Sequence, residues 1–204
     1  WKPRNEMLKA TKADWIFILD GDEVWWEESI KKVVQVAKGS KSGEAESIVV
    51  RSVNLVGDIY HYQEEAAGQY RFLGKKGHLN LRAFSTKIPD LYAKGEYGKM
   101  GYFDKDGKSI QERKETHFLD VSYMHFTHMP RTVTFAKDLE VPKRAKKFKY
   151  EIGQSFPRDF YYPEVFFRQK PLNIPSVWKK MSGKYLARAL LETLFKKVKR
   201  RIFW

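Results

Sequence analysis

Two aspartates separated by one glycine, Asp20 and Asp22, are the residues whose types and spacing most directly predict chemistry. They follow a continuous apolar run from Trp15 to Leu19. A short apolar run without alternation is typical of a strand buried on both faces, as in a parallel sheet. Ligands of open α/β sheets bind at the carboxyl ends of strands, so we expect both carboxylates to face a ligand. The alternative is a polar turn that only ends the strand.

Paired carboxylates at such a place suit a divalent cation, Mg²⁺ or Mn²⁺. Mg²⁺ is usually held by one or two carboxylates together with substrate phosphate oxygens, and it neutralises charge on a departing phosphate group. His125 and His128 are candidate further ligands, because neutral imidazole binds divalent metals. For each histidine the alternatives are a phosphate contact or a hydrogen-bonded side chain at a strand end.

The elements that position these residues can be predicted from periodicity and composition. A short helix is expected over residues 5–11, with Met7, Leu8 and Ala10 turned inward. A strand is expected over 14–19 and a helix over 27–37. Further strands are expected over 47–55, 78–84 and 118–126, a turn over 104–107, and a basic helical stretch over 133–148.

Composition narrows the class of protein. The chain of 204 residues has 39 Lys and Arg against 25 Asp and Glu, a net charge of +14, with 42% hydrophobic and 15% aromatic residues. That content excludes disorder by composition. The absence of cysteine excludes disulfides, thiolate catalysis and cysteine-based zinc sites. We expect three parts: an α/β domain over 1–131, an aromatic and proline-rich extension over 132–177, and a helical tail over 178–204.

The tail combines helical periodicity with a strong positive charge. Residues 178–204 hold nine Lys and Arg and one Glu, so they carry +8 of the net charge of +14. The apolar residues at helical spacing are Tyr185, Leu186, Ala189, Leu190, Leu194, Phe195, Val198 and Ile202. A basic amphipathic helix of this kind fits the interface of an anionic membrane. The alternative is a helix packed on the domain with a solvated basic face.

The stretch from Ala13 to Glu23 (Ala-Asp-Trp-Ile-Phe-Ile-Leu-Asp-Gly-Asp-Glu), with Arg4-Asn5 before it, resembles the centre of family 2 glycosyltransferases of the GT-A fold. The resemblance implies a Rossmann-like α/β domain with a mixed sheet. It also implies that Asp20 and Asp22, with Arg4 and Asn5, bind the metal and the diphosphate of a nucleotide sugar. Glu23 would then lie beside them, near the sugar.

Later segments are similar to the same family. The segment 78–84 (His-Leu-Asn-Leu-Arg-Ala-Phe) is similar to an Arg-Leu-Phe strand, and 120–125 to a strand that ends in histidine, here His125. Tyr92–Tyr97 falls where relatives carry Val-His-Glu, of which only Glu96 remains. Glu96 is therefore the first candidate for the general base, with Asp90 and Asp104 as competitors; a solvated surface acid is the alternative for all three.

The remaining candidates each have two interpretations. Arg82 and Arg131 would bind an acidic acceptor or a phosphate, or else pair with a carboxylate of the protein. Trp25 and Trp26 would line a sugar site, because aromatic faces pack on apolar ring surfaces, or else pack in the core.

The resemblance implies that the chain is the second half of such a domain, truncated at its amino end, and incomplete as an enzyme by itself. The expected activity is inverting, metal-dependent transfer of a sugar from a nucleotide donor to a glycan or lipid-linked acceptor. This is expected at the cytoplasmic face of the membrane, in assembly of surface polysaccharide or lipopolysaccharide.

The main alternative function is a basic nucleic-acid-binding module, since lysines and aromatics alternate at 146–150. The charge is concentrated in the tail, however, and the acidic pair is out of place on a phosphate-binding surface without a metal. We therefore expect no nucleic-acid partner. A metal-dependent nuclease would need further acids at suitable spacing, which the sequence does not show.

Overall fold

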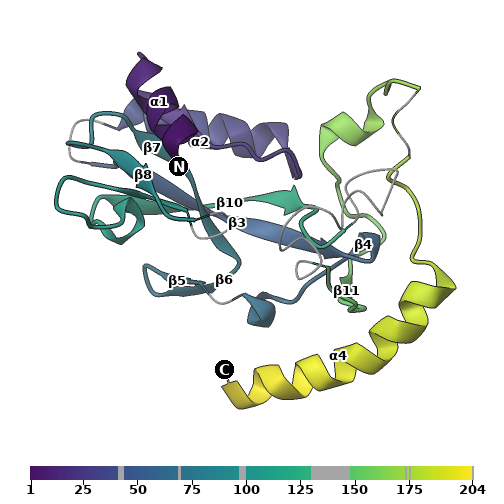
Figure 1. The fold of residues 1–204 in the computed structure, drawn as a ribbon. Coiled ribbons are helices and arrows are strands. Elements are labelled where there is room, and N and C mark those ends of the chain that lie inside the picture. The colour runs from purple at the N-terminus through teal and green to yellow at the C-terminus, as the bar shows by residue number, and fades with distance from the viewer. Residues whose placement is uncertain are drawn as a thin grey trace.

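The computed structural model describes residues 1–40, 44–68, 70–96, 100–129, 148–172, 174 and 176–203. They form a mixed α/β fold around a curled mixed sheet, with a long helix at the carboxyl end (Figure 1). The predicted α/β class is confirmed. The basic stretch predicted over 133–148 lies almost entirely outside the described residues.

Five strands form the main path of the sheet. Their order is β1 (Trp15–Phe17), β7 (Leu79–Ser85), β3 (Ser47–Val56), β10 (Thr116–His125) and β2 (Glu23–Trp25). β3 and β10 are parallel, and the other neighbours on this path are antiparallel. The strands predicted over 47–55, 78–84 and 118–126 are therefore confirmed, and all three lie side by side.

Shorter strands extend this sheet or form hairpins. β4 (Asp58–Tyr62) pairs with both β3 and β11 (Gln154–Ser155). β5 (Tyr70–Phe72) pairs with β6 (Lys75–Gly77), and β8 (Tyr92–Lys94) pairs with β9 (Gly101–Phe103). The turn predicted over 104–107 is present, and Gly107 adopts a φ of 74° there.

The prediction for the strand before the acidic pair was wrong in its environment. β1 is antiparallel to β7, its three residues are half-buried, and Leu19 is 59% exposed. An apolar run reports burial only on average and does not identify the neighbouring strand. Here that neighbour is the antiparallel β7, and all three side chains of β1 are half-buried.

The helices α1 (Lys2–Ala10) and α2 (Glu27–Gly39) confirm two predicted helices. α2 buries Val33 against one face of the sheet, with Ile30 and Val36 packed beside it. α1 packs Leu8 against a core cluster on the other face of the sheet. Met7 is 67% exposed and Ala10 is exposed too, so the expectation that these two residues point inward was wrong.

Alternation along β3 separates the two core clusters. Ile48 and Val50 belong to the cluster beneath α2, whereas Val49 belongs to the cluster formed with Leu79 and Phe84. Successive side chains of a strand point to opposite faces, so β3 is covered on both sides and forms the centre of the fold. The short 3₁₀ helices are η1 (Glu65–Ala67), η2 (Ile110–Glu112) and η4 (Glu164–Phe167).

The described part of the extension packs on the same body as the sheet. Leu55, Ile59 and Met124 form a third cluster with aromatic residues of the extension, which include Phe156, Phe160, Tyr162 and Phe166. The rings of Phe156 and Phe160 stack with centroids 3.9 Å apart.

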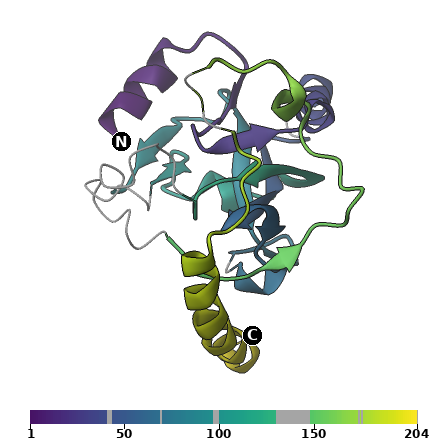
Figure 2. The same cartoon turned by 90° about the vertical axis from the view of Figure 1, so that its right-hand side faces the viewer.

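The carboxyl-terminal helix α4 (Gly183–Phe203) begins five residues later than the predicted start at Trp178. The Ser182 hydroxyl accepts a hydrogen bond from the Tyr185 amide at 3.2 Å, as an N-terminal cap does. In both views α4 lies at the periphery of the molecule, away from the central strands (Figure 2). No helix among the described residues is long and apolar enough to cross a bilayer.

Candidate functional site

The acidic pair lies in the turn between β1 and β2. The Glu23 amide donates to the Asp20 carbonyl at 3.1 Å, which closes the turn, and the Phe126 amide donates to the Asp22 carbonyl at 2.8 Å. The second bond ties the turn to the end of β10. As a result the Asp22 side chain is 5% exposed, whereas that of Asp20 is 46% exposed.

A pocket of about 420 Å³ opens beside this turn. It is lined by five residues predicted from the sequence, Arg4, Asp20, Asp22, Arg82 and His125. Tyr70, Leu79, Asn80 and Tyr102 contribute other parts of its wall. The structure thus brings residues that are up to 121 positions apart in the sequence to one concave surface.

His125 lies next to Asp22 in the wall of this pocket. Its Nε2 lies 3.5 Å from Asp22 Oδ2, and its Nδ1 lies 3.1 Å from Asn54 Oδ1. The other end of the Asn54 amide, Nδ2, lies 2.9 Å from His78 Nδ1. His78 Nε2 in turn lies 3.2 Å from the Glu64 carbonyl oxygen.

The direction of these hydrogen bonds is fixed by the carbonyl at their end. A carbonyl only accepts, so His78 Nε2 must carry a hydrogen. Burial lowers the pKa of His78 to about 4, so the ring is neutral at pH 7 and its Nδ1 is an acceptor. Asn54 must then present its NH₂ to His78 and its oxygen to His125. That oxygen also accepts from the Ser52 hydroxyl at 3.1 Å.

These hydrogen bonds determine which nitrogen of His125 could bind a metal ion. Because its Nδ1 donates to Asn54, the neutral ring has its lone pair on Nε2, facing the Asp22 carboxylate. A cation on this nitrogen, either a proton or a metal ion, would lie beside the Asp22 carboxylate, since Nε2 and Oδ2 are 3.5 Å apart. Metal-binding histidines characteristically donate their other ring N–H to an oxygen that fixes the tautomer. The geometry therefore suits a divalent metal shared by Asp22 and His125.

Arg82 forms the floor of the same site. Its guanidinium pairs with Glu23, donates to the Tyr123 hydroxyl at 3.1 and 2.7 Å, and lies 3.5 Å from Asp20 Oδ2. The Glu23 side chain is fully buried. Burial raises the pKa of Glu23 to about 7, with the charge of Asp20 adding to the shift and that of Arg82 opposing it.

This raised pKa predicts a pH dependence of stability. A carboxyl whose pKa is higher in the folded state binds more protons when folded, so its contribution to stability is lost as pH rises from 4.5 through 7. The Glu23→Gln variant lacks this carboxyl and should not show this loss. The unfolding free energy of the variant minus that of wild type is therefore expected to increase by about 2 kcal/mol from about pH 5 to pH 8. Urea unfolding at both pH values measures this difference; equal pH slopes in the two proteins would contradict it.

The other two donor-site candidates lie in different surroundings. Arg4 lines the pocket and donates to the Tyr102 hydroxyl at 3.2 Å. Asn5 exchanges two hydrogen bonds with the main chain of Ala93, at 2.6 and 3.0 Å, and so fixes α1 to β8. It lines a separate hollow between α1 and the segment before β8.

The two tryptophans pack within the protein. Trp25 is 6% exposed, stacks on Tyr123 with ring centroids 4.7 Å apart, and donates to Glu23 at 3.3 Å. Trp26 donates its indole N–H to the Tyr161 carbonyl at 2.9 Å. Core packing, one of the two interpretations of Trp25, is what the structure shows, and Trp26 joins β2 to the extension.

The acids considered for the general base occupy three distinct places. Glu96 is exposed and follows β8, whose partner β9 contributes Gly101 and Tyr102 to the pocket. Asp104 is buried and accepts hydrogen bonds from two amides of its turn and from Arg113 at 2.8 Å. These bonds hold its pKa below the ordinary value, so Asp104 has a structural role. Asp90 lies on the hollow beside α1.

Two further candidates remain untested by this geometry. His128 lies in the turn after β10 and is not among the residues that line the pocket. Arg131 lies outside the described residues.

Residues that the sequence did not single out complete the site. Ser52 and Asn54 continue the β3 row that begins with Ile48 and Val50, and two polar residues on a core-facing row are the signal that could have indicated them. His78 and Tyr123 gave no such signal, because their partners come from distant segments.

Among the described residues, no group of three or more His, Asp or Glu side chains is arranged to hold a metal ion. A metal held by Asp22 and His125 would thus need further ligands from a substrate. No protein-family model matches the chain, and no curated protein matches it significantly. The resemblance to family 2 glycosyltransferases rests on the sequence motifs quoted above.

Proposed function

We propose that this chain is the acceptor-side and metal-binding part of a GT-A glycosyltransferase, which transfers a sugar from a nucleotide donor. The observation that supports the proposal best is the pairing of Asp22 with His125 Nε2 at the rim of a pocket that two arginines also line. A carboxylate and an imidazole supply two ligands, and the oxygens of a diphosphate would supply others.

The residues of this chain would divide the work as follows. Asp22 and His125 would hold Mg²⁺ or Mn²⁺, which supplies the positive charge that stabilises a departing nucleoside diphosphate. Arg4, on the same pocket, would contact phosphate oxygens. Arg82 fixes Glu23 and Asp20 and so maintains the shape of the acidic turn.

The general base and the acceptor complete the proposal. An inverting transfer needs a base that removes the proton of the acceptor hydroxyl, and Glu96 is our candidate because it is exposed and lies on the hairpin whose other strand lines the pocket. The acceptor would be a glycan or a lipid-linked sugar of a surface polysaccharide or lipopolysaccharide, and the protein would act as a peripheral protein at the cytoplasmic face of the membrane.

The test is a calorimetric titration with UDP, GDP and inorganic pyrophosphate, each with and without Mn²⁺. Pyrophosphate lacks a nucleoside, so it isolates the part of the donor that the described pocket can bind. We expect Mn²⁺-dependent heat with pyrophosphate and with at least one nucleotide. The absence of metal-dependent heat with all three, in protein whose fold is verified by circular dichroism, would refute the proposal.

A further inference from the structure

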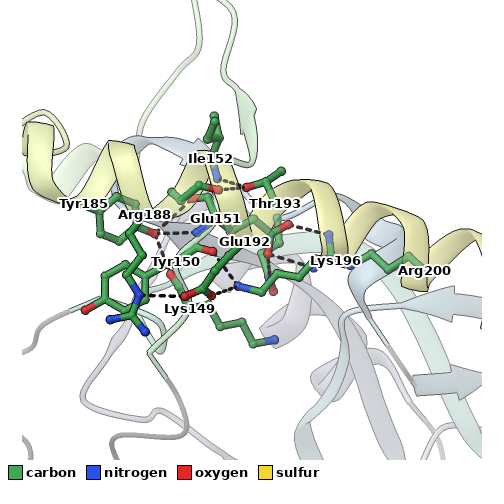
Figure 3. A network of polar contacts seen from close by, with 12 residues as sticks. Lys149, Tyr150, Glu151, Ile152, Tyr185, Arg188, Glu192, Thr193, Lys196 and Arg200 are labelled. Carbon is green, nitrogen blue, oxygen red and sulfur yellow. Dashed lines mark hydrogen bonds and ion pairs between the residues drawn. The ribbon is translucent and has the colours of Figure 1, made fainter.

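Helix α4 is attached to the domain by its polar face. The residues that point inward share a spacing of three or four positions: Tyr185, Ala189, Thr193, Lys196 and Arg200. Figure 3 shows Tyr185, Thr193 and Lys196 beside the segment from Lys149 to Ile152. The Tyr185 hydroxyl donates to the Lys149 carbonyl at 2.7 Å, and the Ile152 amide donates to the Thr193 hydroxyl at 3.0 Å.

A buried ion pair holds the far end of the helix. Arg200 donates to both carboxylate oxygens of Glu151, at 2.5 and 2.9 Å, and to Glu64 at 2.9 Å. Glu151 is 2% exposed and also accepts from Gln63 at 2.8 Å. Burial alone would raise the pKa of Glu151, but the hydrogen bonds and charge of Arg200 and the bond from Gln63 outweigh it and lower the pKa. The helix is therefore fixed in rotation about its own axis.

The opposite face of α4 is apolar and exposed. Six apolar residues on this face are 52% to 78% exposed, and together we call them the apolar stripe: Leu190, Leu191, Leu194, Phe195, Val198 and Ile202. At about 100° per residue, these six lie within a sector centred opposite Ala189 and Arg200. Contiguous apolar surface of this kind on a soluble domain marks a binding surface.

Positive charge borders the apolar stripe on both sides. By the same helical geometry, Arg188 and Lys199 follow one edge and Lys197 follows the other, with Arg188 paired to Glu192 at 2.8 Å. Lys184 and Arg201 lie within the sector itself, near the two ends of the helix. Lysine and arginine at such edges extend their charged ends towards headgroups while their stems lie along apolar surface. A surface that is negatively charged over a broad plane and apolar just beneath it matches both features.

Other occupants match less well. A second copy of α4 packed stripe to stripe would bring rows of like charge together. A nucleic acid would pair with the Lys and Arg edges but would leave the six apolar side chains in water. We propose that the apolar stripe and its basic edges form a docking surface for an anionic lipid bilayer, on which α4 lies parallel to the membrane plane.

This surface is independent of the transfer reaction. Because the polar face is clamped to Glu151 and Glu64, docking would place the whole domain in one orientation on the membrane. A flexible tail with the same sequence would tether the domain without orienting it. The amphipathic character was expected, but the sequence pattern had placed Tyr185 and Ala189 on the apolar side and had omitted Leu191.

The test measures co-sedimentation of the full chain with vesicles of phosphatidylcholine alone and of phosphatidylcholine with about 30% phosphatidylglycerol. We expect binding to the anionic vesicles that weakens with added salt, and weaker binding to the neutral ones. Leu194→Glu is expected to reduce the affinity for anionic vesicles by about tenfold or more. Leu194 is 68% exposed, so the fold tolerates this change.

Matched control variants distinguish a bilayer from a second copy of α4 or a nucleic acid as the partner of the apolar stripe. Leu172→Glu makes the same change at a residue that is fully exposed elsewhere and is expected to leave binding unchanged. Lys199→Gln is expected to weaken binding about fivefold, whereas Lys87→Gln, in an exposed pair with Asp14, is not. Equal binding by wild type and Leu194→Glu would overturn the proposal. So would a dimer that Leu194→Glu dissociates without vesicle binding, or RNA binding that Lys199→Gln weakens and Leu194→Glu leaves intact.

Discussion

Replacing Asp22 with asparagine is expected to lower the affinity for Mn²⁺ together with pyrophosphate, UDP or GDP by at least about 100-fold. The amide has the same size, so it removes the charge that faces His125 Nε2 without changing the shape of the turn. The hydrogen bond from the Phe126 amide goes to the Asp22 main-chain carbonyl and survives. The sugar transfer that we propose is expected to be lost with the binding.

The measurement is the calorimetric titration described above, repeated on Asp22→Asn. The matched control is Asp120→Asn, which removes the same charge from a side chain that is 85% exposed and lies 3.5 Å from Arg51. Unchanged metal-dependent binding in Asp22→Asn would show that the acidic turn only ends a strand. A loss of binding in both variants would show that net charge, and not this site, determines affinity.

Replacing Arg82 with methionine is expected to destabilise the fold by about 3–5 kcal/mol. Methionine fills a similar volume, but it leaves the fully buried Glu23 without its cation and the Tyr123 hydroxyl without its donor. Without this cation the pKa of Glu23 rises further above 7, and a buried acid that loses its partner, together with the lost hydrogen bonds to Tyr123, is one of the few single changes that cost this much. Urea unfolding at pH 7 measures the loss.

A double-mutant cycle identifies the cause of this loss. The pair Glu23→Gln and Arg82→Met is expected to be more stable than Arg82→Met alone, because glutamine stays uncharged at every pH and needs no cation beside it. Lys87→Met, which breaks an exposed pair with Asp14, is expected to change stability by less than about 1 kcal/mol. Strictly additive effects of the two core changes would contradict a charge pair and indicate loss of packing.

The sequence predicted local features well and long-range pairing less well. The acidic turn, α2 and the three long strands were predicted because apolar periodicity and turn residues are local signals. The antiparallel pairing of β1 with β7 was missed, since three apolar residues carry no record of their neighbour. The placement of Asn54 and His78 behind His125 was missed because it joins segments 24 to 71 positions apart.

The start of α4 and its rotation illustrate the same limit. The Ser182 cap is a local signal that marks Gly183 as the first helical residue, and it could have been recognised. Which face of α4 packs inward was decided by Glu151 and Glu64, two acids far away in the sequence. Apolar periodicity alone favours burial of the apolar face, and here the polar face is the buried one.

The chain of hydrogen bonds from Glu64 to His125 distinguishes two groups of residues in and behind the pocket, those that fix the His125 tautomer and those that shape the pocket wall. The tautomer of His125, with its hydrogen on Nδ1, is fixed through His78 and Asn54 by the Glu64 carbonyl, a main-chain atom that no substitution removes. Residues such as Tyr70 and Tyr102, which shape the pocket, take no part in fixing this tautomer. Substitutions in the wall can therefore change the shape of the pocket while the tautomer of His125 beside Asp22 stays the same.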